Sequence, residues 1–273
     1  MDAAHTIRDC IATVTALRLH RTGDPLLGAA VGTIKTLQAR RFRGTYADLM
    51  GSPSFGPAAR FFLTELYSDS DYTDRDLQFS RIAGTLQTLF PQPVVATAVA
   101  LAELHAQTES LDQDMGRAWV AQSPAPMAPL APAAGPDTSA SASTSPGLSA
   151  SPASDAARYT AAWRAVGQAA ARHAQLARVL AMGRDLARLT RTPGLRMMLR
   201  MMRAPAHAAG MGALQDFLEA GFDTFGQLSR QRGGVEQFLA TIETRERALM
   251  DMLFGADRVA CETRLSDTLG QAR

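Results

Sequence analysis

The sequence predicts an all-α protein, a multi-helix bundle in two halves joined by a disordered Pro/Ala/Ser linker. Apolar residues recur every three or four positions along most of the chain, which is the spacing of one helix face. We find no segment with the alternating pattern of a half-buried strand. The chain has 273 residues, 46% of them hydrophobic, so it can bury a full core in one large domain or two small ones.

The predicted linker covers residues 122–154. It holds seven of the chain's fourteen prolines, and Asp137 is its only charged residue. Repeated proline removes the backbone donors that a helix needs, and few large apolar side chains are present to offset the ordering entropy. We therefore expect an N-terminal helical half over 1–121, a linker over 122–154 and an Arg-rich helical half over 155–273, with the halves packed together.

The N-terminal half begins with a predicted helical hairpin. Apolar stripes cover residues 7–17 and 27–37, and Asp24 followed by Pro25 between them is typical of a helix start. Pro57 then predicts the start of a helix that runs through residues 61–67.

Two more helices are predicted before the linker. Thr73 followed by Asp76 resembles an acidic capping box and predicts the start of the first. Pro93 predicts the start of a long helix whose apolar stripe reaches Trp119.

After the linker, one long helix is predicted from Tyr159 to a break at Pro193. Pro205 predicts a further boundary, so a helix with three phenylalanines is expected to begin near Ala206. The glycines at 233–234 precede the last predicted helix.

The first half contains FFLTELY at residues 61–67, between RRFRGTYADLM and RDLQFSRI, and the second half contains AAWRAVG and VEQFLATIETRERAL. These segments resemble the bacterial FFLEELY motif protein family over most of both halves. Thr64 stands where the family motif has Glu, and the linker is longer than the usual join. The resemblance implies a shared helical fold and an uncharacterised family, and it supplies no mechanism.

The motif itself is chemically modest. Phe61, Phe62, Leu66 and Tyr67 lie at helical spacing and make a wide apolar face. We predict that this face packs in the core, and the alternative is a partner-binding groove built on aromatic anchors.

Catalytic and metal-binding patterns have little support. Glu103, His105 and Glu109 form a Glu-x-His pattern without a second copy, so a local ion pair or hydrogen bond is favoured over metal ligation. Cys10 and Cys261 lie in amphipathic stripes, where small buried side chains are expected. We therefore predict no catalytic residues, no metal site and no cofactor, although a pocket for haem or a small molecule between helices stays open.

A basic stretch is more informative. Ten arginines and one acidic residue, Asp185, lie between residues 158 and 203. Arg196, Arg200 and Arg203 are spaced to share one helix face, opposite a Leu/Met stripe. We predict that these three arginines bind an anionic partner, and the alternative is that they face solvent or pair with acidic residues of the first half.

The leading functional hypothesis is a non-enzymatic cytoplasmic protein that binds another macromolecule, with an acidic protein as the first candidate partner. Nucleic acid or an anionic membrane surface stays open as the anionic partner. The runner-up is an α-helical ligand- or cofactor-binding protein, possibly an enzyme, whose site is assembled from residues distant in sequence. Widely spaced cysteines, the absence of a recognisable signal sequence and the lack of a long apolar run predict the cytoplasm and no transmembrane segment. The richness in Arg and Ala, with Lys35 as the only lysine, indicates a bacterial genome.

Overall fold

The computed structural model describes residues 2–65, 72–122 and 152–272, and these form helices without a strand. The all-α prediction is therefore confirmed for this part of the chain. The helices are α1 (Ala3–Gly23), α2 (Pro25–Thr45), α3 (Ala47–Gly51), α4 (Gly56–Glu65), α5 (Thr73–Leu89), α6 (Gln92–Ala121), α7 (Pro152–Val166), α8 (Ala169–Leu189), α9 (Leu195–Ala208), α10 (Gly212–Arg230), α11 (Gly234–Gly255) and α12 (Arg258–Gln271).

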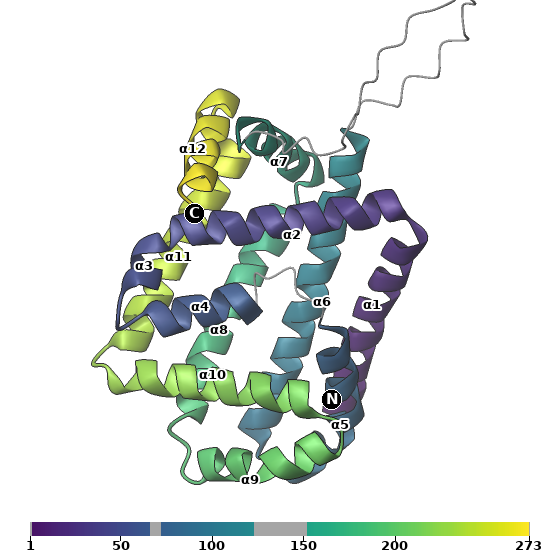
Figure 1. Cartoon of the computed structure of the whole chain (residues 1–273), viewed down its shortest axis with the longest axis vertical. Helices are drawn as coiled ribbons and strands as arrows, with labels where there is room; N and C mark the ends of the chain where they lie inside the picture. Colours follow the sequence, from purple (N-terminus) through teal and green to yellow (C-terminus); the bar gives the residue numbers. More distant parts are fainter. Residues whose placement is uncertain (1, 66–71, 123–151, 273) are drawn as a thin grey trace, which may run out of the picture.

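The long helices α6, α8 and α11 run along the molecule, and α2 and α10 lie across them (Figure 1). Helices on the two sides of residues 123–151 are in contact, because α6 packs on α7 and α8 while α12 packs on α2. Most of the predicted linker lies outside the described residues. Its last part is helical, since α7 begins at Pro152, a residue type favoured in the first turn of a helix.

The core follows the apolar stripes that the sequence shows. Its larger cluster joins α2, α4, α6, α7, α8, α10, α11 and α12, and it completely buries Phe42, Phe225 and Phe238. A smaller cluster joins α1, α5 and the start of α10 to the first half of α6. Phe217 of α10 and Leu101 of α6 pack against both clusters, so the two are adjacent parts of one interior.

The predicted hairpin of α1 and α2 is confirmed. The Asp24 carboxylate accepts a hydrogen bond of 3.1 Å from the Leu27 backbone N–H, and Pro25 occupies the first turn, where no backbone donor is needed. The predicted capping box at Thr73 is wrong. Tyr72 occupies the capping position of α5, and the Asp76 carboxylate takes part in buried ion pairs instead.

Three further predicted boundaries are wrong. The helix predicted from Tyr159 to Pro193 is broken at Gly167 and Gln168, which both have positive φ and separate α7 from α8. Pro205 lies inside α9, which continues to Ala208. Because α9 ends there, the phenylalanine-rich helix α10 begins at Gly212 instead of near residue 206.

Candidate functional site

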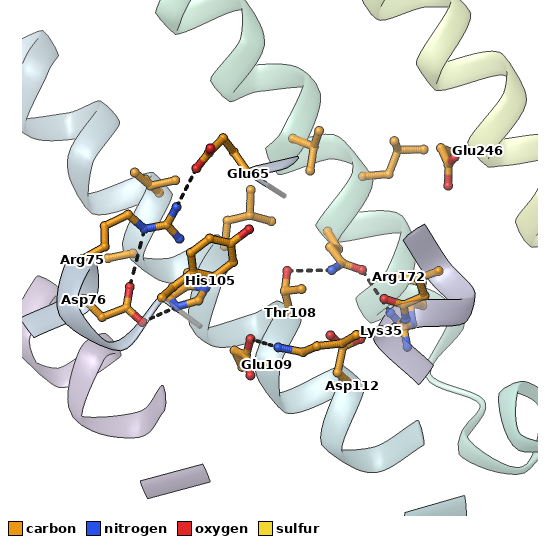
Figure 2. A pocket seen from close by; sticks show the side chains of 18 of the residues that line it. Lys35, Glu65, Arg75, Asp76, His105, Thr108, Glu109, Asp112, Arg172 and Glu246 are labelled. Atoms are coloured by element: carbon orange, nitrogen blue, oxygen red, sulfur yellow. Dashed lines mark hydrogen bonds and ion pairs between the residues drawn. The ribbon is translucent and has the colours of Figure 1, made fainter. Parts of the chain in front are cut away.

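A cavity of about 120 Å³ lies between helices from both ends of the chain, and charged side chains line it (Figure 2). Its charged lining residues are Lys35, Arg41, Glu65, Arg75, Asp76, His105, Glu109, Asp112, Arg172 and Glu246. These residues come from α2, α4, α5, α6, α8 and α11. Burying so many charges is costly unless they are paired, so their pairing is informative about the site.

Helix α6 forms one wall of this charged cavity. His105, Thr108, Glu109 and Asp112 follow at intervals of three, one and three residues, which places them on one face of the helix. The opposite wall comes from α8, where Gln175 donates a 2.8 Å hydrogen bond to the Thr108 hydroxyl. The charged cavity is thus held between two directly bonded helices.

Asp76 is the centre of one charge cluster. Its carboxylate lies 2.6 Å from the Arg18 guanidinium and 2.8 Å from the His105 ring, and Figure 2 shows Arg75 between Asp76 and Glu65. Burial acts to raise the pKa of Asp76, but hydrogen bonds and charges from His105 and Arg18 outweigh it and lower this pKa below its ordinary value. The cluster therefore favours the ionised carboxylate.

Glu109 is the centre of a second cluster. Its carboxylate forms ion pairs with Lys35 and, at 2.8 Å, with Arg21. Burial opposes ionisation, yet the two cations lower the pKa of Glu109 to about 2. Sequence analysis expected Glu109 and His105 to form local polar contacts at a helix surface; both are paired, but these contacts are in the interior.

A third pair links distant parts of the sequence. The Arg41 guanidinium bonds to the Glu246 carboxylate, which also accepts a 2.8 Å hydrogen bond from the Tyr46 hydroxyl. Arg41 and Glu246 are both buried and stand 205 residues apart. This pair joins α2 to α11 beside the charged cavity.

Arg172 differs from the other buried cations of the site. It is 6% exposed, it forms no ion pair with a described carboxylate, and its guanidinium lies over the Trp163 ring at 4.4 Å. Within the described ranges, Arg172 Nη2 and Trp163 Nε1 are both buried without a hydrogen-bond partner. Two neighbouring donors therefore lack an acceptor at this end of the charged cavity.

Asp112 is a buried carboxylate whose charge interacts with that of Arg172, although the two form no ion pair. Its Oδ1 accepts a 3.0 Å hydrogen bond from Gln38, and burial raises its pKa above the ordinary value despite the nearby charges of Lys35 and Arg172. The protonated form of Asp112 is thus favoured more than in water.

A second cavity, of about 260 Å³, adjoins the charged one and is lined almost entirely by apolar side chains. Phe61 and Phe62 of the FFLTELY segment contribute to its wall, together with residues from α5, α6, α8, α9 and α10. An apolar cavity of about 150 Å³ is already large enough to stay dry and hold benzene. We call this space the apolar cavity.

The FFLTELY residues divide between the interior and the undescribed part of the chain. Phe61 and Phe62 are buried, and Phe62 packs against Phe225 and Phe238 with ring centroids 6.3 and 5.3 Å away. Leu66 and Tyr67 lie outside the described residues. The retained glutamate of the motif, Glu65, reaches the charged cavity and bonds to Arg75 at 3.1 Å.

The three predicted partner-binding arginines lie on α9. Arg196 bonds to Asp223 at 2.7 Å, and Arg203 bonds to Glu219, both on the neighbouring helix α10. Arg200 is exposed and forms no ion pair in the described part of the chain. The partners of Arg196 and Arg203 within the protein thus come from α10. The alternative considered from the sequence was pairing with acidic residues of the first half.

Sequence analysis did not identify Arg172, Trp163, Lys35 or Glu246 as site residues. One signal was present in the sequence of α6. Glu109 and Asp112 lie next to the apolar stripe of this helix, whereas charged residues of an amphipathic helix normally lie on the opposite, exposed face. Charges within a buried stripe indicate a polar interior, but they do not identify the partners from other helices.

The fold and these cavities define a class of protein: an all-helical protein with a charged internal cavity next to an apolar one. The chain belongs to a family described as a domain of unknown function, DUF8198, whose model matches residues 17–259. This assignment fits the expectation of an uncharacterised family, and the FFLEELY resemblance itself stays a prediction. No curated protein and no solved structure matches the chain.

None of the helices in the described residues has the length and apolar character needed to cross a membrane. The same residues hold no group of three or more His, Cys, Asp or Glu side chains arranged to bind a metal ion.

Proposed function

We propose that this protein binds a small carboxylate-bearing molecule in the charged cavity, which is the ligand-binding alternative from the sequence. The observation that carries the proposal is the buried Arg172 guanidinium, which lies on Trp163 and has no carboxylate partner in the described chain. A guanidinium presents paired N–H donors that match the two oxygens of a carboxylate. A bound carboxylate would also provide acceptors for the two unpaired donors.

The surrounding charges favour a monoanion. The ionised Glu109 carboxylate lines the same charged cavity, and a phosphate with two negative charges would be repelled by it more strongly than a carboxylate. The cavity's volume of about 120 Å³ fits a small group and not a folded partner. A bacterial cytoplasmic setting and membership of the FFLEELY motif family remain part of this proposal.

Arg172→Gln tests the proposal. We expect it to weaken binding of butanoate about 10- to 100-fold, because a hydrogen bond to a charged group contributes about 1.5–3 kcal/mol. Isothermal titration calorimetry of the full chain with butanoate, and with butanamide as the uncharged analogue, measures this change.

The matched control is Arg178→Gln, since Arg178 lies on the same helix with its side chain exposed. Trp163→Phe provides a second variant that keeps an aromatic ring beside Arg172 and removes the indole donor together with the pyrrole ring. Equal binding of butanoate and butanamide, or unchanged butanoate binding by both Arg172→Gln and Trp163→Phe, would rule out a carboxylate site at this position.

A second candidate function is binding of an anionic macromolecule, first of all an acidic protein, through Arg196, Arg200 and Arg203. The supporting observation is that Arg200 is exposed without an ion pair among the described residues and lies beside Met197 and Met201, which are 68% and 71% exposed. Exposed methionines next to a cation are typical of adaptable binding surfaces.

Replacing Arg196, Arg200 and Arg203 by glutamine should leave helical content and melting temperature nearly unchanged, because exposed ion pairs contribute about 0–1 kcal/mol. The same triple variant should bind poly-glutamate more weakly and with a flatter salt dependence. The control triple variant replaces Arg247, Arg258 and Arg264, which are exposed on α11 and α12. Equal losses in both triple variants would mean that only net charge matters; duplex DNA and phosphatidylserine vesicles test the other anionic partners.

A further inference from the structure

The space between α6 and α8 changes from charged to apolar along the two helices. On α6 the charged lining ends at His105, and the same face continues towards the N-terminus with Leu101 and Ala98. On α8 the change falls between Gln175 and Val179. Because the Thr108–Gln175 bond fixes these helices against each other, the two changes occur at the same level of the molecule.

The charged cavity and the apolar cavity have six lining residues in common. The side chains that line both are Phe79, Leu101, Leu104, Val179, Leu214 and Phe217. All six are apolar, so the lining on this side of the charged cavity already favours a hydrocarbon group. A molecule bound at Arg172 therefore meets apolar side chains on the side that faces the apolar cavity.

Two of the three polar side chains that line the apolar cavity, Thr97 and Gln215, are occupied by bonds within the protein. The Gln215 amide donates to the Leu199 carbonyl at 2.7 Å and to Glu219 at 2.8 Å, and the Thr97 hydroxyl donates to the Pro93 carbonyl at 2.9 Å. These groups have fewer bonds to offer a polar ligand, so the apolar cavity selects for hydrocarbon.

The apolar cavity also has an adaptable outer wall. Met198, Leu199 and Met202 of α9 line it and are only partly buried, and Ala206 is the one fully buried residue that this helix contributes. Unbranched methionine side chains adjust to chains of different length and shape. This wall suits a flexible chain better than a rigid ring system.

We propose that the ligand is an amphiphile with a single aliphatic chain, whose carboxylate binds at Arg172 and whose chain lies in the apolar cavity. This inference rests on the carboxylate-binding function proposed above and names the class of carboxylate. From Arg172 to Leu189, the length of α8 beside the two cavities is about 26 Å at 1.5 Å per residue. The chain of the ligand would follow this direction, past the shared apolar residues.

Titration of the full chain with butanoate, octanoate and dodecanoate, each as a monomer in solution, tests the inference. We expect affinity to increase about fourfold for each methylene that enters the apolar cavity, which is the ratio expected for burying one such group. Arg172→Gln should weaken all three acids by a similar factor.

Ala98→Leu places a larger side chain in the apolar cavity. We expect it to weaken dodecanoate binding at least tenfold and to leave butanoate binding unchanged. Ala96→Leu is the matched control, because Ala96 lies on the same helix with an exposed side chain. If Ala98→Leu does not fold, Val94→Phe at the same cavity provides the measurement.

The outcomes separate the two proposals. Butanoate binding that depends on Arg172 but does not strengthen with chain length would overturn the aliphatic-chain inference and leave the carboxylate site intact. Dodecanoate binding that both cavity-filling variants leave unchanged would also overturn it. Failure of all three acids to bind would remove the carboxylate function itself.

Discussion

Replacing Phe62 by alanine is expected to lower the free energy of unfolding by about 3–5 kcal/mol, the range for removing a buried phenylalanine ring. Phe62 is 2% exposed and packs against two other phenylalanines, Phe225 and Phe238. The two contacts join α4 to α10 and α11, so the ring links helices from both sides of the undescribed segment 123–151. Urea unfolding followed by circular dichroism measures the change.

Thr64→Ala is the control for Phe62→Ala. Thr64 lies two residues further along α4 with an exposed side chain, and its hydroxyl bonds to the backbone of its own helix. Its replacement should change stability by about 0.5 kcal/mol or less. A Phe62→Ala protein as stable as wild type that no longer bound carboxylates would show that the motif serves the ligand instead of the fold.

Replacing Glu109 by glutamine is expected to destabilise the protein at pH 7 by about 3–5 kcal/mol, because removal of one member of a buried ion pair leaves its partners unpaired. Here Lys35 and Arg21 would both lose their carboxylate. Glu103→Gln on the same helix is the control, since Glu103 does not line the charged cavity. Denaturant unfolding of the three proteins at pH 7 provides the comparison.

Glu109 also predicts how stability depends on pH. Its pKa is lowered from 4.5 to about 2 in the folded protein, so its contribution is present above about pH 4.5 and is lost as the pH falls towards 2. This lowering corresponds to about 3 kcal/mol. Asp112 acts in the opposite direction: its raised pKa contributes stability at low pH that is lost as the pH rises past 3.8.

The difference in unfolding free energy between wild type and Glu109→Gln reports the contribution of Glu109, including its effect on Asp112, whose pKa the Glu109 charge raises. We expect this difference to shrink steadily between pH 5 and pH 3. A constant difference over this range would mean that Glu109 is not the ionised centre of its cluster.

Most of the helices can be predicted from the amino-acid sequence, because helix formation depends on residues within one or two turns of each other. The Asp24–Pro25 start of α2 is local in this sense, and so is the spacing of apolar residues along α6. The failures concern weak local signals. Gly167 ends α7, but a single glycine is a weak signal for a helix end. Pro205 was expected to end a helix, yet α9 continues through it to Ala208.

The ionic interior was only partly visible in the sequence. Sequence analysis considered His105 and Glu109 together and expected polar contacts, which the structure shows as buried bonds to Asp76 and Lys35. These partners lie 29 and 74 residues away in the chain. No local pattern specifies a partner at such a separation, since the pairing depends on how the helices cross.

The candidate site depends on how the helices pack together and has no local signal in the sequence. Arg172 looks in the sequence like one of ten similar arginines in a basic stretch. Only the packing of α8 against α6, with Trp163 of α7 beside it, buries its guanidinium away from the exposed arginines of α9. The cause is geometric: the sequence sets which side chains share a helix face, but the depth of that face in the molecule depends on helices contributed by the rest of the chain.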